Sequence, residues 1–270
     1  MKPSPFDYAR PASLDLALAT MAEHADSASL IAGGQSLVPL LNLRMAPSEL
    51  IVDISRLLEL REIRDLGDRV FLGAGLTHAM FEDGVAPDPG NGLMRKTAEN
   101  IAYRAIRCHG TIGGSVAMAD PAADWPAVLL ALGAVAILRS EGAERRVTMN
   151  DLLVGTYETS LHQGEIIVGF EIAKLPPTAR TSYIKFNKKV GAFATSLAVA
   201  VHGETTRVVI AGAGSRARIL RKTSEALATG ADAIACIGGD LDEIMSEPDA
   251  YLRQLHVTTI TRAIGEVLGA

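Results

Sequence analysis

The sequence predicts an α+β protein of two domains, and three observations support this fold class. Helix-like and strand-like apolar patterns are mixed over residues 1–175, a proline pair follows at Pro176 and Pro177, and three strand-like runs then precede two helical stretches. Proline pairs terminate regular structure and mark linkers. Strands grouped apart from helices are typical of a small sheet covered on one side. We therefore expect domains at residues 1–175 and 177–270.

The first elements follow from capping residues and apolar spacing. Ser13 can cap a helix over residues 14–25, whose apolar residues recur at helical spacing. A short buried strand at residues 28–34 ends in a glycine turn, and Ser36 is expected to open a short helix over residues 36–44. Two further strands are predicted at residues 50–55 and 69–78.

The middle of the chain contains a longer apolar run, and its patterns predict a helix and a hairpin. Residues 94–107 indicate one helix that leads into a glycine loop. The apolar run at residues 125–138 is interrupted by Gly133, which predicts a buried helix followed by a buried strand. The remaining elements are predicted as strands and then helices: strands at 134–140, 145–149, 165–175, 181–189, 194–203 and 206–214, and helices at 221–230 and 250–268.

Composition argues against several classes of function. The formal charge is −5 and the chain has no long basic stripe, which disfavours nucleic-acid binding. Its longest apolar run is shorter than the roughly 20 residues that a membrane-spanning helix needs. Asp15 interrupts the apolar N-terminal segment, so a signal peptide is not expected. Cys108 and Cys236 stand alone, so we expect no metal site and a reduced, cytoplasmic protein.

Two loops carry a Gly-Gly pair with a serine close behind, in "IAGGQSLVPLL" at residues 31–41 and "TIGGSVAMADPAAD" at residues 111–124. Consecutive glycines let backbone N–H groups converge on an anionic oxygen, and a following helix N-terminus adds a favourable dipole. A single glycine pair is more often an ordinary turn. Two such loops can hold a pyrophosphate from opposite sides, which indicates a dinucleotide cofactor.

A competing motif lies near the C-terminus. Gly212 and Gly214, with Ala217, follow a strand-like run and satisfy the G-x-G-x-x-A fingerprint of a Rossmann-type NAD dehydrogenase, with Asp232 at the spacing of a ribose contact. The residues after Gly214 are too few for a full doubly wound sheet. The NAD interpretation therefore remains an alternative.

Three segments carry a resemblance to a known family: "IAGGQSLVPLLNLR", "GTIGGSVAMADPAADWPAVLLALGA" and "YIKFNKKVGAFATSLAVAV". They resemble the FAD-binding medium subunit of the molybdenum hydroxylases, a group that includes bacterial carbon monoxide dehydrogenase, quinoline oxidoreductase and the flavin domain of xanthine dehydrogenase. The resemblance covers nearly the whole chain. It implies a FAD-binding domain of the vanillyl-alcohol-oxidase (PCMH) type with two α+β subdomains, followed by a small C-terminal α+β domain with an antiparallel sheet.

The resemblance also implies partners and a role. In such enzymes a large subunit holds molybdopterin and hydroxylates the substrate, and a small subunit holds two [2Fe–2S] clusters. The medium subunit's FAD collects the electrons and passes them to an external acceptor, in a dimer of three-subunit units. The missing cysteine clusters agree with this division. No catalytic side chain is expected, because flavin electron transfer needs no protein nucleophile.

The resemblance also implies which residues of this chain form the FAD site, by their positions in the matching segments. The two loops should wrap the FAD pyrophosphate, through Ala32, Gly33, Gly34, Gln35, Ser36, Thr111, Ile112, Gly113, Gly114 and Ser115. Asp124 resembles the family aspartate that lies beside the ribityl and adenosine region of FAD. The alternative is that Asp124 is the N-cap of a helix. Lys185 resembles a lysine near the flavin, or it is a solvated strand lysine. Phe193 resembles an aromatic residue beside the isoalloxazine, or it packs in the core.

The chain departs from its relatives in one place and leaves two further alternatives. Many relatives read Arg-Asn-x-Gly before the second loop, where this chain has Arg107, Cys108, His109 and Gly110. The cysteine-bearing insertion of hydroxybenzoyl-CoA reductases is absent. A lone His78 is assigned no chemistry. A cofactor-free scaffold subunit and a free-standing flavin oxidase are alternative interpretations of the same fold.

Overall fold

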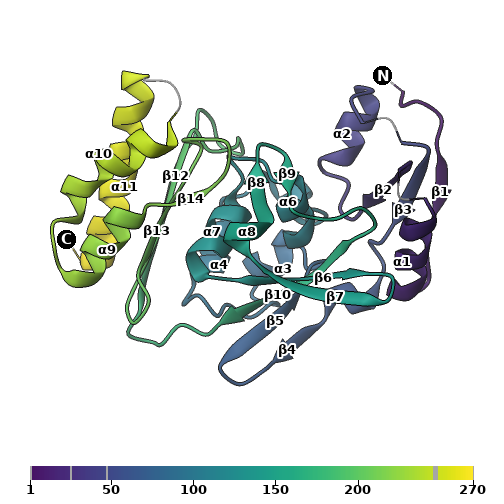
Figure 1. Ribbon diagram of the computed structural model, residues 1–270, viewed down its shortest axis with the longest axis horizontal. Helices are drawn as coiled ribbons and strands as arrows, with labels where there is room; N and C mark the ends of the chain where they lie inside the picture. The colour runs from purple at the N-terminus through teal and green to yellow at the C-terminus, as the bar shows by residue number, and fades with distance from the viewer. Residues whose placement is uncertain (1, 25, 47, 246–248, 270) are drawn as a thin grey trace.

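The computed structural model describes residues 2–24, 26–46, 48–245 and 249–269. In it the chain forms three sheet-based units that lie side by side along the long axis of the molecule (Figure 1). The N-terminal unit lies at one end, a five-stranded sheet with its helices lies in the middle, and a four-stranded sheet with three helices lies at the other end. The mixture of helices and antiparallel sheets confirms the α+β class.

The N-terminal unit is a parallel three-stranded sheet with two helices. Its strand order is β1-β3-β2: Asp7–Ala9, Leu50–Asp53 and Ala28–Ile31. Helix α1 (Leu14–Glu23) begins after Ser13, whose hydroxyl accepts a hydrogen bond from the Leu16 N–H as predicted. Helix α2 (Leu37–Asn42) begins directly after Ser36, as predicted, although the Ser36 side chain makes no capping hydrogen bond.

The middle unit is an antiparallel sheet with the strand order β4-β5-β10-β6-β7. These strands span Ile63–Asp65, Arg69–Gly73, Ile166–Ala173, Val135–Ser140 and Ala143–Thr148. Short elements connect and cover them: η1 (Leu58–Arg61), α3 (His78–Glu82), α4 (Leu93–Glu99), α5 (Arg104–Arg107), α6 (Ile112–Met118), α7 (Asp124–Leu132), α8 (Met149–Leu152), β8 (Leu153–Gly155) and β9 (Glu158–Thr159). Gly133, with a φ of 67°, ends α7 and turns the chain into β6, as the sequence predicted.

The single helix predicted over residues 94–107 is wrong. The chain leaves the helix at Asn100, whose side-chain amide donates to the carbonyl of Lys96. Ala102 then takes a φ of 44°, in the left-handed region, before α5 begins. Arg107 donates to the carbonyls of Ile101 and Ala102 and so stabilises the break. This contact is tertiary, and therefore the helical spacing of the sequence does not reveal it.

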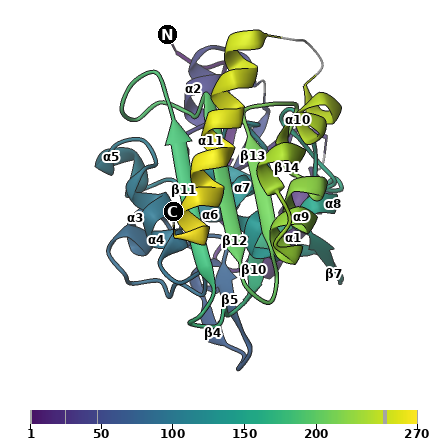
Figure 2. The same ribbon diagram turned by 90° about the vertical axis from the view of Figure 1, so that its left-hand side faces the viewer.

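The C-terminal unit is an antiparallel sheet in the order β11-β12-β13-β14, with helices on one face (Figure 2). Its strands are Arg180–Phe186, Ser196–His202, Arg207–Ala211 and Arg218–Ile219, and its helices are α9 (Arg221–Thr229), α10 (Ala233–Ile244) and α11 (Ala250–Leu268). Helix α10 was missed from the sequence because two adjacent glycines interrupt its pattern, each of them unfavourable in a helix.

The structure contradicts the Rossmann interpretation. The segment after β13 turns at Gly212, with a φ of 84°, and continues into the antiparallel strand β14 instead of a helix. A side chain at Gly212 would meet the carbonyl oxygen of Thr195 at 2.8 Å, so this glycine serves close backbone packing. Asp232 caps α10 through the N–H groups of Ile234 and Ala235. Among the described residues, the segment after these glycines leads into β14, so the strand–turn–helix arrangement of the alternative NAD site is not formed there.

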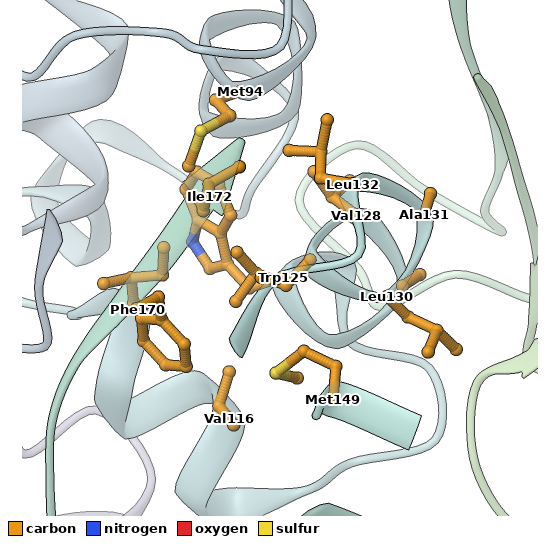
Figure 3. Close-up of a cluster of buried hydrophobic side chains, with 14 of the residues drawn as sticks. Met94, Val116, Trp125, Val128, Leu130, Ala131, Leu132, Met149, Phe170 and Ile172 are labelled. Carbon is orange, nitrogen blue, oxygen red and sulfur yellow. The ribbon is translucent and has the colours of Figure 1, made fainter. Parts of the chain in front are cut away.

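The largest core lies around helix α7. Every residue of α7 is buried, because the helix packs against the middle sheet on one side and against β12 and β13 on the other. Trp125 is fully buried, and Figure 3 shows it among Met94, Phe170 and Ile172. The same core extends to apolar side chains of β12 and β13. The middle and C-terminal units therefore share one continuous hydrophobic core.

Candidate functional site

One large cavity, of about 840 Å³, gathers residues from all three units. Its lining includes both glycine loops, together with segments that follow β3, β5 and β11. Of the residues proposed from the sequence it contains Ala32, Gly33, Gly34, Gln35, Ser36, Thr111, Gly113, Gly114, Ser115, Asp124, Lys185 and Phe193. Ile112 does not line it, because its side chain is fully buried in the core.

The first loop is tightly packed but keeps free donors. Gly34 has a φ of 70°, and a Cβ placed on Gly33 would lie 2.0 Å from the carbonyl oxygen of His109. The Gln35 side chain donates back to the carbonyl of Gly33 at 3.0 Å. Within the described part of the chain, the backbone N–H groups of Gly34, Gln35 and Ser36 have no acceptor. This loop therefore keeps free amides of the kind that an anion-binding nest uses.

The second loop differs from the expected nest. The N–H of Gly113 donates to the carbonyl of Ala74, and the N–H of Gly114 donates to the hydroxyl of Thr111, the N-cap of α6. The Ser115 N–H is also used, by the Thr111 carbonyl. A Cβ on Gly113 would lie 2.5 Å from that of Ala74, so this glycine allows α6 to approach the end of β5. The loop therefore offers hydroxyl groups to a ligand more than amides.

Asp124 and Lys185 form a buried ion pair at the cavity. The Lys185 ammonium lies 2.9 Å from a carboxylate oxygen of Asp124 and also donates to the carbonyl of Asn100. The Tyr183 hydroxyl donates to the same carboxylate. Burial raises the pKa of the Asp124 carboxyl, and the charge of Lys185 and the hydrogen bond from Tyr183 oppose that rise. Burial, followed by the Asp124 charge, raises the pKa of Tyr183, which keeps this hydroxyl protonated.

These contacts exclude the structural alternatives for three residues, and the FAD-site interpretation of each stays a prediction. Asp124 is the first residue of α7 and not its cap, since Ala123 occupies the cap position. Lys185 is not a solvated strand lysine, because only 5% of its side chain is exposed. Phe193 is not a core residue, since it is 60% exposed on the loop between β11 and β12. That loop is held by the Tyr103 hydroxyl, which donates to the carbonyl of Val190.

Sequence reasoning missed several lining residues. Ser55 and Arg56 follow β3, and Glu165 precedes β10, where Arg145 holds its carboxylate at 2.6 Å. Asp120 also lines the cavity and accepts hydrogen bonds from the Ala122 N–H and the Tyr157 hydroxyl. Their position directly beside predicted strands or in the "DPAAD" segment was the available signal. Nothing in the residue pattern alone indicates that they share a cavity.

The segment that departs from the relatives, Cys108 and His109, lines the cavity. It follows α5, which two arginines tie to α3: Arg107 makes two hydrogen bonds of 2.8 Å to Glu82, and Arg104 binds both Glu82 and Asp83. The Arg107 hydrogen bonds lower the pKa of Glu82. This network fixes the segment that packs on Gly33.

We expect Glu82→Gln to lower the free energy of unfolding at pH 7 by about 1–2 kcal/mol, because two guanidinium groups lose their charged acceptor. The folded-state pKa of Glu82 is depressed, so its contribution is present above the unfolded value of 4.5 and is lost as the pH falls through the folded value. Urea unfolding at pH 7 and pH 3 measures this difference. The control is Glu99→Gln, which removes an exposed pair with Arg95; equal losses in both variants would contradict the prediction.

Among the residues that the structure describes, no group of three or more His, Cys, Asp or Glu side chains is arranged to hold a metal ion. In the same residues, no helix is long and apolar enough to cross a membrane.

Comparison with known proteins places the site in context. Residues 4–175 match the family of the FAD binding domain in molybdopterin dehydrogenase. The chain is 38% identical over 224 residues to 6-hydroxypseudooxynicotine dehydrogenase complex subunit alpha of Paenarthrobacter nicotinovorans, covering 80% of this chain and 76% of the relative. It is 31% identical over 265 residues to the carbon monoxide dehydrogenase medium chain of Hydrogenophaga pseudoflava, covering 92% of both. A solved structure of carbon monoxide dehydrogenase from that organism superposes with a TM-score of 0.93 at 28% identity, over 100% of this chain and 99% of the other.

Proposed function

The chain belongs to the family of FAD-binding domains of molybdopterin dehydrogenases, and from this premise we propose that it is the medium, electron-transferring subunit of a heterotrimeric molybdenum hydroxylase. FAD is its cofactor and it is an oxidoreductase subunit. In the proposed complex, electrons pass from the [2Fe–2S] clusters of a small subunit to FAD and on to an external acceptor. A large subunit holds molybdopterin and carries out the hydroxylation.

The observation that carries this proposal is the cavity that gathers residues of all three units. It combines a loop with free amides, hydroxyl donors, a buried lysine–aspartate pair and an exposed aromatic ring. These donors fit a dinucleotide, because pyrophosphate oxygens accept hydrogen bonds from amides and hydroxyls. A Cβ at Gly33 or Gly113 would overlap neighbouring atoms, so the close packing of the loops requires glycine at both positions. When bound, FAD supplies the capacity to take up electrons from one centre and release them to another.

The residues of this chain then bind and orient the cofactor. We propose that residues 32–36, together with Thr111 and Ser115, hold the pyrophosphate. Lys185 places a positive charge at the cavity wall, and Asp124 balances it and holds its position. Asp124 can also accept hydrogen bonds from cofactor hydroxyls. Phe193 offers an exposed ring that can cover a planar ring system and keep water from it.

We also propose the wider organisation. The FAD-binding domain spans residues 1–175 and the C-terminal domain spans residues 177–270, and the end of the family match at residue 175 supports this division. The complex is a cytoplasmic dimer of heterotrimers. The names of the relatives, which include a medium chain and a subunit of a dehydrogenase complex, support assembly with further subunits.

The first test is an absorption spectrum of the chain after incubation with FAD and removal of the excess. We expect flavin absorption near about 450 nm and release of FAD on denaturation. A folded chain that stays colourless after this treatment would favour a cofactor-free scaffold.

The second measurement addresses the partners. The tagged chain, purified from its own cells, should bring two further chains with roughly four iron atoms per FAD, as two [2Fe–2S] clusters contain, together with molybdenum. An isolated flavin-containing chain that turns over a substrate without iron or molybdenum would instead support a free-standing flavin oxidase.

A further inference from the structure

His78 occupies an unusual position between the core and the cavity. Only 6% of the surface of this residue is exposed. The Trp125 indole N–H donates to Nδ1 of the ring at 2.9 Å. Because Nδ1 accepts this hydrogen bond, the proton of the neutral ring is carried by Nε2. The tautomer is therefore set by Trp125, a fully buried core residue.

The other ring nitrogen faces the cavity. His78 lines the cavity, and its Nε2 has no hydrogen-bond partner among the residues that the structure describes. The backbone N–H of His78 donates to the carbonyl of Gly110, directly before the second loop. A Cβ placed on Gly110 would lie 2.6 Å from Nε2, so only glycine leaves this nitrogen accessible. Nε2 is therefore a donor at the cavity wall that remains free for an acceptor on a bound ligand.

The ring also remains uncharged. Burial, with a smaller effect of the Arg107 charge, lowers the pKa of His78 to about 4. The imidazole is therefore a neutral donor at ordinary pH. It can bind an oxygen atom without requiring a counter-charge.

We propose that His78 is an FAD-binding residue, whose Nε2–H donates a hydrogen bond to an oxygen atom of the bound cofactor beside Gly110. This assignment rests on the proposed position of FAD in the cavity. It gives a role to the histidine to which the sequence assigned none. It also explains why the donor is oriented by the indole of Trp125 and why glycine stands at position 110.

The test compares two substitutions that separate the two ring nitrogens. His78→Asn keeps an acceptor for the Trp125 indole but removes the Nε2 donor, and we expect it to weaken FAD binding to the full-length apo chain roughly ten-fold. His78→Gln places an amide donor near the position of Nε2, and we expect it to recover most of the affinity. Flavin fluorescence titration gives both dissociation constants, and thermal unfolding shows that the variants are folded.

A direct readout accompanies the titration. In the chain labelled with ¹⁵N-histidine, the protonated Nε2 resonance of His78 should shift when FAD is added. Repeating the titration with ADP and with riboflavin shows which half of the cofactor carries the acceptor. An unmoved Nε2 resonance, with wild-type affinity in His78→Asn, would overturn the assignment. Normal FAD binding by a Gly33→Val variant would instead show that the cavity itself is not the FAD site.

Discussion

Replacing Gly33 with valine is expected to weaken FAD binding by about 100-fold or more, equivalent to about 3 kcal/mol. A Cβ at this position would lie 2.0 Å from the carbonyl oxygen of His109 and 2.9 Å from the Cα of Gly110. Both neighbours are backbone atoms, so no side-chain rotation relieves the overlap. The two loops that line the cavity must separate, and the free amides of the first loop lose their position.

Flavin content after reconstitution, measured by absorption, gives the result for Gly33→Val. The control is Gly265→Ala, because a Cβ there meets nothing within 4 Å and its φ is not positive. Alanine also favours the helix at that position. We expect the control to retain FAD fully. A Gly33→Val chain with wild-type flavin content would show that this cavity is not the FAD site.

The second large effect concerns the buried ion pair. Replacing Lys185 with methionine should lower the free energy of unfolding by about 3–5 kcal/mol, because the Asp124 carboxylate stays buried without its counter-charge. The two side chains are only 5% and 4% exposed, so water cannot take the place of the lysine. The double variant, with Asp124→Asn added, leaves no uncompensated charge and should recover part of the loss.

Urea unfolding of the apo chain measures these variants without interference from the cofactor. The control is Lys222→Met, whose pair with Glu243 has side chains that are 55% and 64% exposed. We expect no measurable change there. If Lys185→Met and Lys222→Met had the same stability as the wild-type chain, the pair would not contribute to folding. FAD titration of the same variants then separates a role in binding from a role in stability.

The parts of the fold that the sequence predicts well depend on local chemistry. Ser13 caps α1 through its own hydroxyl, and Gly133 ends α7 with a positive φ, so both are visible from neighbouring residues. The break at Ala102 and the helix α10 were missed. The first depends on an arginine side chain that reaches back to the backbone, and the second contains two glycines that a local pattern treats as a turn.

The candidate site shows the same division. Both glycine loops were predicted from their residue pattern. Only the structure shows that the amides of the second loop already donate hydrogen bonds to Ala74 and Thr111. Lys185 and Asp124 were each identified by resemblance. Their pairing joins a strand to a distant helix, and no spacing rule predicts it. His78 was set aside because a lone histidine carries no pattern, and its indole partner lies on another helix.

The complete burial of helix α7 has a consequence for electron transfer. A helix with no solvent face has no room to tilt, so the carboxylate at its first residue and the lysine on the adjoining sheet keep their separation when a nearby group gains or loses an electron. Surroundings whose dipoles are already oriented need little rearrangement as charge arrives. In the electron-transfer role proposed for this chain, such rigid packing would keep the reorganisation energy small, and the rate of transfer would then depend on the packing around Trp125.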